Sequence, residues 1–165
     1  MPRPELERTV QQSVLDRLID QDPGVTADPP TTLAQSTRQF KAAVRRDLEW
    51  LLNTRRIATP APDTFDEVPH SLYHYGLPDV TSLSADSPES RLWLLNRIEE
   101  TIAMFEPRLT GVRVSLSETR ADGGRELRFL IEATLRMDPN PEQVVFDTVL
   151  ELGSGAYQVA GASSA

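Results

Sequence analysis

The hydrophobic pattern of this chain changes its period at one short seam, FEPRL, which runs from Phe105 to Leu109. Before the seam, in LWLLNRIEETIAMF, apolar residues recur at helical spacing, which predicts an amphipathic helix. After the seam, in GVRVSLSE, apolar and polar residues alternate, which predicts a strand with one buried face. A pattern with one of these periods does not suit the other structure. We therefore expect an α+β fold in which helices come first and strands last.

Two long helices are expected before the seam. The first runs from about Thr32 to Asn53, and the second from Pro88 to Phe105, with Ser87 as its N-cap. The apolar face of the first comprises Phe40, Val44, Leu48, Leu51 and Leu52, and that of the second Leu94, Leu95, Ile98, Ile102 and Phe105. The connection from Thr54 to Ser87 is irregular, and so long a connection in a compact domain usually has a function.

A shorter amphipathic segment, Val10 to Asp20, predicts a helix that is too short to be stable alone. After the seam, alternating residues predict a hairpin around the turn ADGG and a third strand from Glu142 to Leu152. The predicted fold is therefore a set of N-terminal helices followed by a helix packed on a small antiparallel or mixed C-terminal sheet. We expect one domain over residues 1–165, with 1–12 and 156–165 flexible.

Composition narrows the classes of function. The formal net charge is −8, so the chain offers no basic field for nucleic acid or anionic lipid. It contains no cysteine, which suits a reducing cytosol and removes disulfides and thiolate chemistry. No apolar run reaches the roughly 18 residues of a membrane span. We expect a cytoplasmic protein with no nucleic-acid partner and no direct membrane insertion.

No motif nominates a catalytic, cofactor or metal site. His70 and His74 stand four apart, but a neighbouring proline and glycine argue against a helix that would present both to one metal. The phosphate-binding and nucleophile-elbow motifs are missing from the sequence. Acidic residues are plentiful, yet no two of them are marked as the acid and nucleophile of a glycosidase. We therefore expect no enzyme activity, no cofactor and no metal.

Two charges are placed where helices do not favour them. Glu106 sits at the C-terminal end of a helix, where the partial negative charge repels a carboxylate. Asp47 lies within the apolar face of the first long helix, where it is either solvated at a gap or paired with an arginine. We expect Glu106 and Arg108, which flank Pro107, to be structural. Arg108 would reach a carboxylate such as Asp47, and Glu106 an arginine such as Arg55.

The helix before the seam carries a second apolar feature on the side away from its core face. Trp93, Arg97, Glu100 and Met104 follow helical spacing there. Either another layer of the same protein covers Trp93, or this stripe meets a partner, since tryptophan, methionine and arginine are enriched at interfaces. We favour Trp93 and Met104 as contacts to a partner.

Four stretches of sequence carry a family resemblance. They are SVLDRL from Ser13, VRRDLEWLLNTRR from Val44 to Arg56, SLYHYGLPD from Ser71 to Asp79, and FEPRL. In this order they resemble TssE, the baseplate wedge subunit of bacterial type VI secretion systems. That family is similar to a small wedge protein of contractile phage tails and is also labelled lysozyme-like. The similarity extends from about Ser13 to Leu152, and DLEWLLNTRR with EPRL is its most specific part.

The resemblance implies a structural protein with a fold similar to the core of a sheath subunit. It implies that the protein binds other wedge subunits in the cytoplasm and helps to start assembly of the contractile sheath. It also implicates the Glu-Pro-Arg motif in the fold and in assembly contacts. The alternative that the family label raises is a muramidase that cleaves peptidoglycan.

A protein similar to a sheath subunit would offer an unpaired sheet edge to strands of the first sheath ring. We expect this edge among the C-terminal strands, in EQVVFDTVLEL, Glu142 to Leu152. Val145 and Val149 are the positions at which we expect docking hydrogen bonds. Asp147 and Glu151 would discourage indiscriminate pairing of such an edge.

Overall fold

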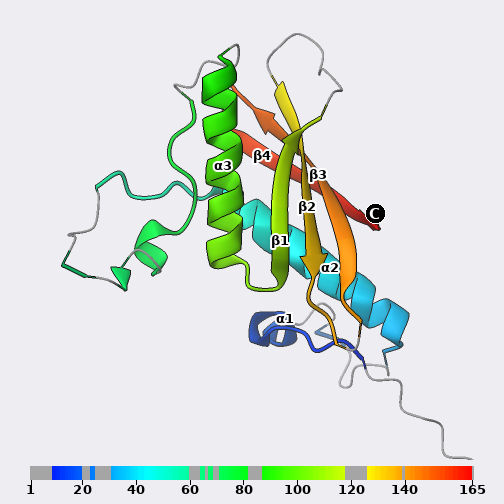
Figure 1. Ribbon diagram of the computed structural model, residues 1–165. Helices are drawn as coiled ribbons and strands as arrows, with labels where there is room; N and C mark the ends of the chain where they lie inside the picture. The colour runs from blue at the N-terminus through cyan, green and yellow to red at the C-terminus, as the bar shows by residue number, and fades with distance from the viewer. Residues whose placement is uncertain are drawn as a thin grey trace, which may run out of the picture.

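The computed structural model of the protein describes residues 9–19, 23–24, 31–59, 64–65, 67–68, 71–81, 87–117, 126–138 and 140–164. Helices come first and a four-stranded antiparallel sheet follows, which confirms the α+β class (Figure 1). The helices are α1 (Val14–Leu18), α2 (Leu33–Asn53) and α3 (Pro88–Phe105), and a 3-10 turn, η2, spans Leu72–His74. The strands are β1 (Leu109–Leu116), β2 (Glu126–Leu135), β3 (Glu142–Glu151) and β4 (Ala156–Ser164).

Local sequence sets the starts of both long helices. At the start of α2, the N–H of Gln35 donates to Thr32 Oγ1 at 3.3 Å, and the Gln35 side chain accepts from the N–H of Thr32 at 3.0 Å. This capping box satisfies donors that the first turn of a helix leaves unpaired. At the start of α3, Ser87 accepts from the N–H of Ser90 at 3.2 Å, and Pro88 fills the first turn. The predicted starts are therefore confirmed.

The strands form a meander in the order β1-β2-β3-β4, and every neighbouring pair is antiparallel. The β2–β3 pairing is regular from Glu126↔Glu151 to Leu135↔Glu142. The outer pairings each contain an irregularity, one in β1 between Thr110 and Arg113 and one opposite β3 between Phe146 and Thr148. The sheet is thus regular at its centre and distorted toward both edges.

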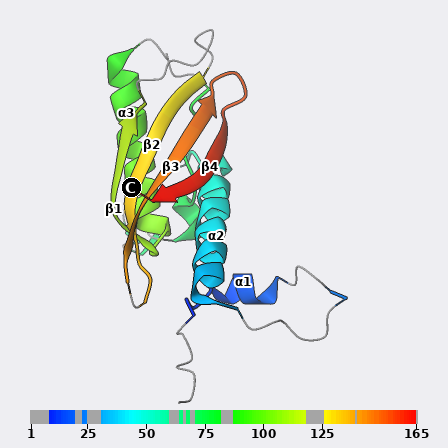
Figure 2. The same cartoon turned by 90° about the vertical axis from the view of Figure 1, so that its right-hand side faces the viewer.

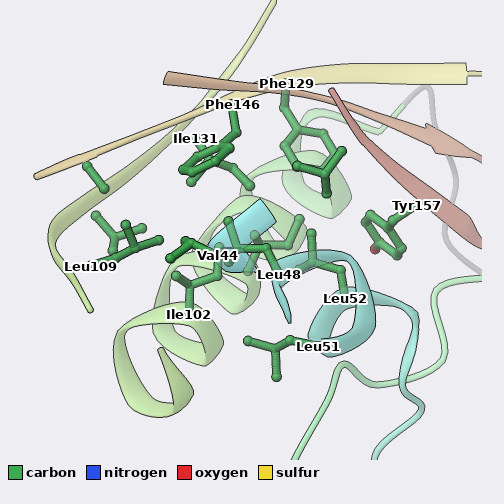
Figure 3. Close-up of a cluster of buried hydrophobic side chains, with 14 of the residues drawn as sticks. Val44, Leu48, Leu51, Leu52, Ile102, Leu109, Phe129, Ile131, Phe146 and Tyr157 are labelled. Carbon is green, nitrogen blue, oxygen red and sulfur yellow. The ribbon is translucent and has the colours of Figure 1, made fainter. Parts of the chain in front are cut away.

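The core lies between one face of the sheet and the two long helices (Figure 3). Helix α2 packs against β4, and α3 packs against β1 (Figure 2). The side chains that lose all accessible surface include Val44 and Leu48 of α2, Ile98 and Ile102 of α3, and Ile131, Leu135, Phe146 and Leu150 of the sheet. The predicted apolar face of α2 is buried, and that of α3 is buried at Leu94, Ile98 and Ile102 and partly buried at Leu95 and Phe105.

The prediction of a flexible C-terminal tail is wrong for residues 156–164. They form β4, with Tyr157 and Val159 buried against the core at 3% exposure each. The alternation of these two apolar residues is short, and the glycine and small residues beside it weaken the strand signal. At the other end, Val10 lies in the segment predicted to be flexible, yet it is buried and its N–H donates to Ser36 Oγ at 3.2 Å. Residues 1–8 lie outside the described part of the chain.

The prediction that β3 is an edge strand is also wrong. Val145 pairs with Glu132 of β2 and with Ser163 of β4, and Val149 likewise has partners on both sides. Once the tail forms β4, β3 becomes a central strand, because β4 takes its outer hydrogen bonds. A proline in β3 would therefore break the sheet rather than remove docking bonds. The edges of the described sheet are β1 and β4.

Helix α1 is shorter than the predicted Val10–Asp20 segment, and it contains no buried residue. Ser13 caps it through the N–H of Asp16 at 3.2 Å. Val14 and Leu18 are 73% and 76% exposed, so the apolar side of α1 faces away from the core. Within the described residues, no helix is long and apolar enough to cross a membrane.

Candidate functional site: the Arg108 network

The seam between α3 and β1 forms a tight turn that directs Arg108 back toward the helices. Glu106 is the C-cap of α3, and its N–H donates to the carbonyl of Ile102 at 2.9 Å. The N–H of Leu109 then donates to the Glu106 carbonyl at 3.1 Å, which closes the turn over Pro107. Pro107 cannot continue the helix, so the break falls at this point. The local sequence thus positions the Arg108 side chain between α3 and α2.

Arg108 binds two carboxylates. Its Nε donates to Glu106 Oε1 at 2.7 Å, its Nη2 pairs with Glu106 Oε2, and its backbone N–H donates to Glu106 Oε1 at 3.2 Å. The same Nη2 donates to Asp47 Oδ2 of α2 at 2.6 Å. Glu106 is only 5% exposed. The unfavourable charge at the end of α3 is therefore compensated by an arginine two residues further along the chain.

A second arginine extends these contacts to α1. Arg46 Nη2 donates to Asp47 Oδ1 and to Asp16 Oδ1, both at 2.7 Å. Asp16 Oδ2 accepts from Ser13 Oγ at 2.6 Å and lies 3.9 Å from Arg108 Nη1. We call the set Asp16, Arg46, Asp47, Glu106 and Arg108 the Arg108 network. It joins α1, α2 and the turn after α3 through alternating charges.

The network shifts the ionisation of its members. Burial raises the pKa of Asp16, but hydrogen bonds from Ser13 and Arg46 and the charges of both arginines outweigh it, so that pKa lies below its ordinary value. Burial lowers the pKa of Arg108, but contacts with Glu106 and Asp47 outweigh it, so the pKa is raised. Nη1 of Arg108 is buried and has no hydrogen-bond partner among the described residues.

A groove of about 610 Å³ opens beside the network. Tyr75 and Phe105 form one side, with their rings 5.3 Å apart in an edge-on arrangement. Trp50 forms another part of the wall, and the Arg46 guanidinium lies 4.8 Å from the centre of its ring. Burial, followed by the charges of Asp47 and Glu106, raises the pKa of Tyr75. The groove is therefore lined both by aromatic side chains and by the charged groups of Asp47, Glu106 and Arg108.

The predicted ion pairs are present in part. Arg108 contacts Asp47, the partner that we predicted, so Asp47 is paired rather than solvated at a gap. Glu106 does not contact Arg55, because Arg108 already binds it, and this pairing is corrected. Arg55 follows the end of α2, where it bridges to Leu77, and its side chain reaches Asp79 at 3.2 Å. That pair is exposed, with 63% and 53% of the two side chains accessible.

The stripe on α3 is separate from the network. Trp93 and Met104 are 38% and 44% exposed, so the part of the chain that the structure describes leaves both accessible. Arg97 pairs with Glu100 at 2.8 Å, and its guanidinium lies 5.8 Å from the centre of the Trp93 ring. Trp93 is thus held by its own helix. A role in partner binding remains a proposal.

The arrangement of carboxylates differs from that of a glycosidase, whose two carboxyl groups face each other across a sugar-binding cleft. Asp47 and Glu106 instead converge on one guanidinium. Among the described residues, no group of three or more histidine, cysteine or acidic side chains is arranged to hold a metal ion. Of the two histidines considered as ligands, His74 belongs to η2 and His70 lies outside the described residues.

Sequence reasoning missed Asp16, Arg46 and Tyr75 as parts of this site. All three lie within the stretches SVLDRL, VRRDLEWLLNTRR and SLYHYGLPD, which carried the family resemblance. Their convergence depends on how α1 and the irregular connection lie against α2 and the turn after α3. Helical periodicity does not contain this information.

The comparisons with known proteins agree with the motifs. The family model of baseplate wedge protein gp25 matches residues 38–140, which is more than half of the 165 residues. The matched region contains α2 from residue 38 onward, all of η2, α3, β1 and β2, and the Glu-Pro-Arg turn. No curated protein and no solved structure matches the chain. The chain belongs to the gp25 family of baseplate wedge proteins.

Proposed function

We propose that this protein is the TssE-type wedge subunit of a type VI secretion baseplate and that it acts in the bacterial cytoplasm as a structural component. Membership of the gp25 family supports a place in a contractile injection machine. The four stretches that resemble TssE favour the secretion system over a phage tail. The proposed partners are the other wedge subunits and the proteins of the contractile sheath.

The observation that carries this proposal is the groove beside the Arg108 network. The groove is lined by Phe40, Trp50, Tyr75 and Phe105. Asp47, Glu106 and Arg108 also line it, and the arginine binds both carboxylates. Aromatic walls around fixed polar groups suit recognition of a protein segment. Wedge subunits would dock here, because the groove lies beside the motif that the resemblance associates with assembly.

A second proposed contact is the stripe of Trp93 and Met104 on α3. Both side chains are accessible and lie away from the core, and a tryptophan at the centre of an interface can contribute about 2 kcal/mol or more to binding. We propose that a neighbouring wedge subunit covers this stripe. The groove and the stripe would then contact different surfaces within the wedge.

For the start of sheath assembly, we propose that the last residues of β4, 160–164, take the role that the sequence suggested for β3, because side chains of α2 bind the outer edge at Tyr157 and Val159. Strand β4 is at the edge of the sheet, and strand addition to an edge joins subunits in register through main-chain hydrogen bonds. The antiparallel meander provides such an edge at the C-terminal side of the chain.

Copurification from the native host tests the proposal. A tagged chain should retain the other wedge subunits, and Trp93→Ala should weaken that retention while the melting temperature changes little. Leu72→Ala, which truncates an 81% exposed apolar side chain outside α3, serves as the matched control. A tagged wild-type chain that retains no wedge subunit would refute the assignment, and a large drop in the melting temperature of Trp93→Ala would place Trp93 in the core.

The alternative function is a muramidase, which the lysozyme-like label of the family raises. The purified protein would then release soluble fragments from peptidoglycan and would lose that activity in Glu106→Gln. The pairing of Glu106 with Arg108 favours the structural role, because this carboxylate is already engaged in the turn after α3. We expect intact peptidoglycan after incubation with the wild-type protein.

A further inference from the structure

The outer edge of β4 is occupied by a side chain of α2. The N–H of Tyr157 donates to Asn53 Oδ1 at 2.9 Å, and Asn53 Nδ2 donates to the Tyr157 carbonyl at 2.9 Å. Both backbone groups of Tyr157 therefore point away from β3 and bind one amide. A residue in a neighbouring antiparallel strand would form the same pair of bonds. Asn53, the last residue of α2, thus replaces a strand at this point.

A second side chain of α2 covers the next outward position. Arg45 Nη1 donates to the Val159 carbonyl at 3.3 Å. Val159 is two residues after Tyr157, so its carbonyl faces the same edge. Arg45 and Asn53 are eight residues apart, which places them on one side of the helix. Helix α2 therefore covers the edge of β4 from Tyr157 to Val159.

The other edge of the sheet is protected in a different way. Glu99 of α3 accepts from the N–H of Val114 in β1 at 3.2 Å. Strand β1 also contains an exposed charge, Arg113, and an irregularity in its pairing. Both features discourage another strand from pairing. Strand β4, with the sequence AYQVAGASS, contains neither charge nor proline, so its protection has to come from outside the strand.

We propose that Asn53 and Arg45 keep the edge of β4 closed to a second copy of this chain. Two copies related by a two-fold axis would present identical uncharged strands to each other, and antiparallel pairing would satisfy the donors and acceptors of both. No side-chain charge within β4 opposes this pairing. The two α2 side chains oppose it by occupying the required backbone groups in advance. This inference concerns the isolated chain and does not depend on the proposed place in a baseplate.

The test is the mass of purified variants in solution over a range of concentrations. The double variant Asn53→Ala with Arg45→Ala should change from monomer to dimer as concentration rises, so that its mass doubles, while the wild type remains a monomer. Arg38→Ala, which removes an exposed charge from the same helix, is the control and should remain a monomer. A folded double variant that remains a monomer up to its solubility limit would overturn the proposal.

A third substitution tests whether dimers form through β4. Gln158 is exposed at the centre of the covered stretch, and Gln158→Lys in the double variant would bring like charges together in a β4 pair. The mass should return to that of a monomer. A dimer that withstands Gln158→Lys would show that another surface is responsible, which would refute the inference.

The single variant Asn53→Ala provides a second measurement if the double variant does not fold. Its Tyr157 amide should exchange with solvent faster than in the wild type at low concentration, because the acceptor of that N–H is gone. Exchange at Tyr157 should slow again as concentration rises and dimers cover the edge. Exchange that is fast at every concentration would contradict pairing through β4.

Discussion

The apolar core beneath the sheet and the Arg108 network beside it hold the protein together in different ways. In the core, Leu48, Ile102 and Phe146 lose all or nearly all accessible surface by packing against many neighbours. This stabilisation is non-directional, and such a core tolerates exchanges that preserve volume. In the network, each contact depends on direction and on a specific partner. A core substitution leaves a cavity, whereas a network substitution leaves an unpaired charge.

This difference indicates what each region contributes. Burial of apolar surface supplies the free energy of folding, while a buried ion pair is weak evidence for net stability because its desolvation offsets its attraction. The network does, however, fix how the turn after α3 and the segment around α1 lie against α2. We infer that the core determines whether the chain folds and that the network determines the shape of the groove.

The largest effect is expected for Arg108→Ala. This substitution leaves Glu106 buried without its partner and removes one of the two arginines from Asp47. Removing one member of a buried pair typically costs about 3 to 5 kcal/mol. The free energy of unfolding, measured with urea, should fall by this amount. A fully stable Arg108→Ala variant that still copurifies with wedge subunits would contradict both the structural and the assembly role of the motif.

The matched control for that prediction replaces both members of the local pair. Glu106→Gln with Arg108→Met removes both charges and keeps similar volumes, so no buried charge is stranded by the change. The double variant should be more stable than Arg108→Ala, since a buried pair often exchanges for uncharged groups at little net cost. If the two variants are equally unstable, packing rather than charge explains the role of Arg108.

A smaller effect is expected for Gly76→Ala, which affects the connection between the two regions. Gly76 has a φ of +97°, and a Cβ at this position would lie 2.1 Å from the carbonyl oxygen of Thr54. Left-handed strain alone costs about 1 to 3 kcal/mol, and the clash with backbone adds to it, so we expect a loss of about 3 kcal/mol. Tyr75 and Leu77 flank this glycine and contact the groove and the core, respectively.

Gly153→Ala is the control for that substitution. Nothing lies within 4 Å of a Cβ at Gly153, and its backbone is outside the left-handed region. Its unfolding midpoint should equal that of the wild type. Equal midpoints for Gly76→Ala and Gly153→Ala would refute the claim that this connection is held tightly against the end of α2.

The core could be predicted from sequence to a greater extent than the network, for a physical reason. Burial of Phe40, Val44 and Leu48 follows from helical periodicity, and this periodicity can be read from the local sequence alone. The Arg108–Asp47 contact was deduced from two misplaced charges, but periodicity does not determine which arginine reaches which carboxylate. Arg46 is adjacent to Asp47 in the sequence, and Asp16 lies in a helix of only five residues. The sequence pattern around them therefore does not show that Arg46 and Asp16 contact each other.

The same reasoning explains the error at the C-terminus. Strand β4 contains only two buried apolar side chains among the residues whose burial is described, and its other positions there are small or polar. Its stability comes from pairing with β3 and from contacts with α2, including the Asn53 amide. Such non-local contacts override weak local propensity. Assigning β3 to the edge followed directly from missing this strand.

A smaller effect that depends on pH is expected for Asp16→Asn. The pKa of Asp16 lies below its ordinary value of 3.8 in the folded protein, so its charge stabilises the fold above that value. The contribution is lost as pH falls through the lower folded-state pKa. At neutral pH, Asp16→Asn should cost about 1 kcal/mol, since asparagine still accepts hydrogen bonds but lacks the charge. In urea titrations from pH 7 downward, the difference from wild type should shrink in acid. A difference that stays constant with pH would refute an electrostatic role.

The smallest effect is expected for Arg55→Ala, which compares an exposed arginine with the buried one. Arg55 and Asp79 form an ion pair at 3.2 Å, but water reaches most of both side chains. Water and salt screen such a pair, and the entropy lost in ordering two mobile side chains offsets its attraction. Asp79 is also held independently, because it accepts from the N–H and the hydroxyl of Thr81 at 3.0 and 2.8 Å, and these bonds lower its pKa. The unfolding midpoint of Arg55→Ala should therefore equal that of wild type within error, at low and at high salt. A loss comparable to that of Arg108→Ala would show that exposure does not separate the two arginines, and the contrast between a buried network and a solvated surface pair would fail.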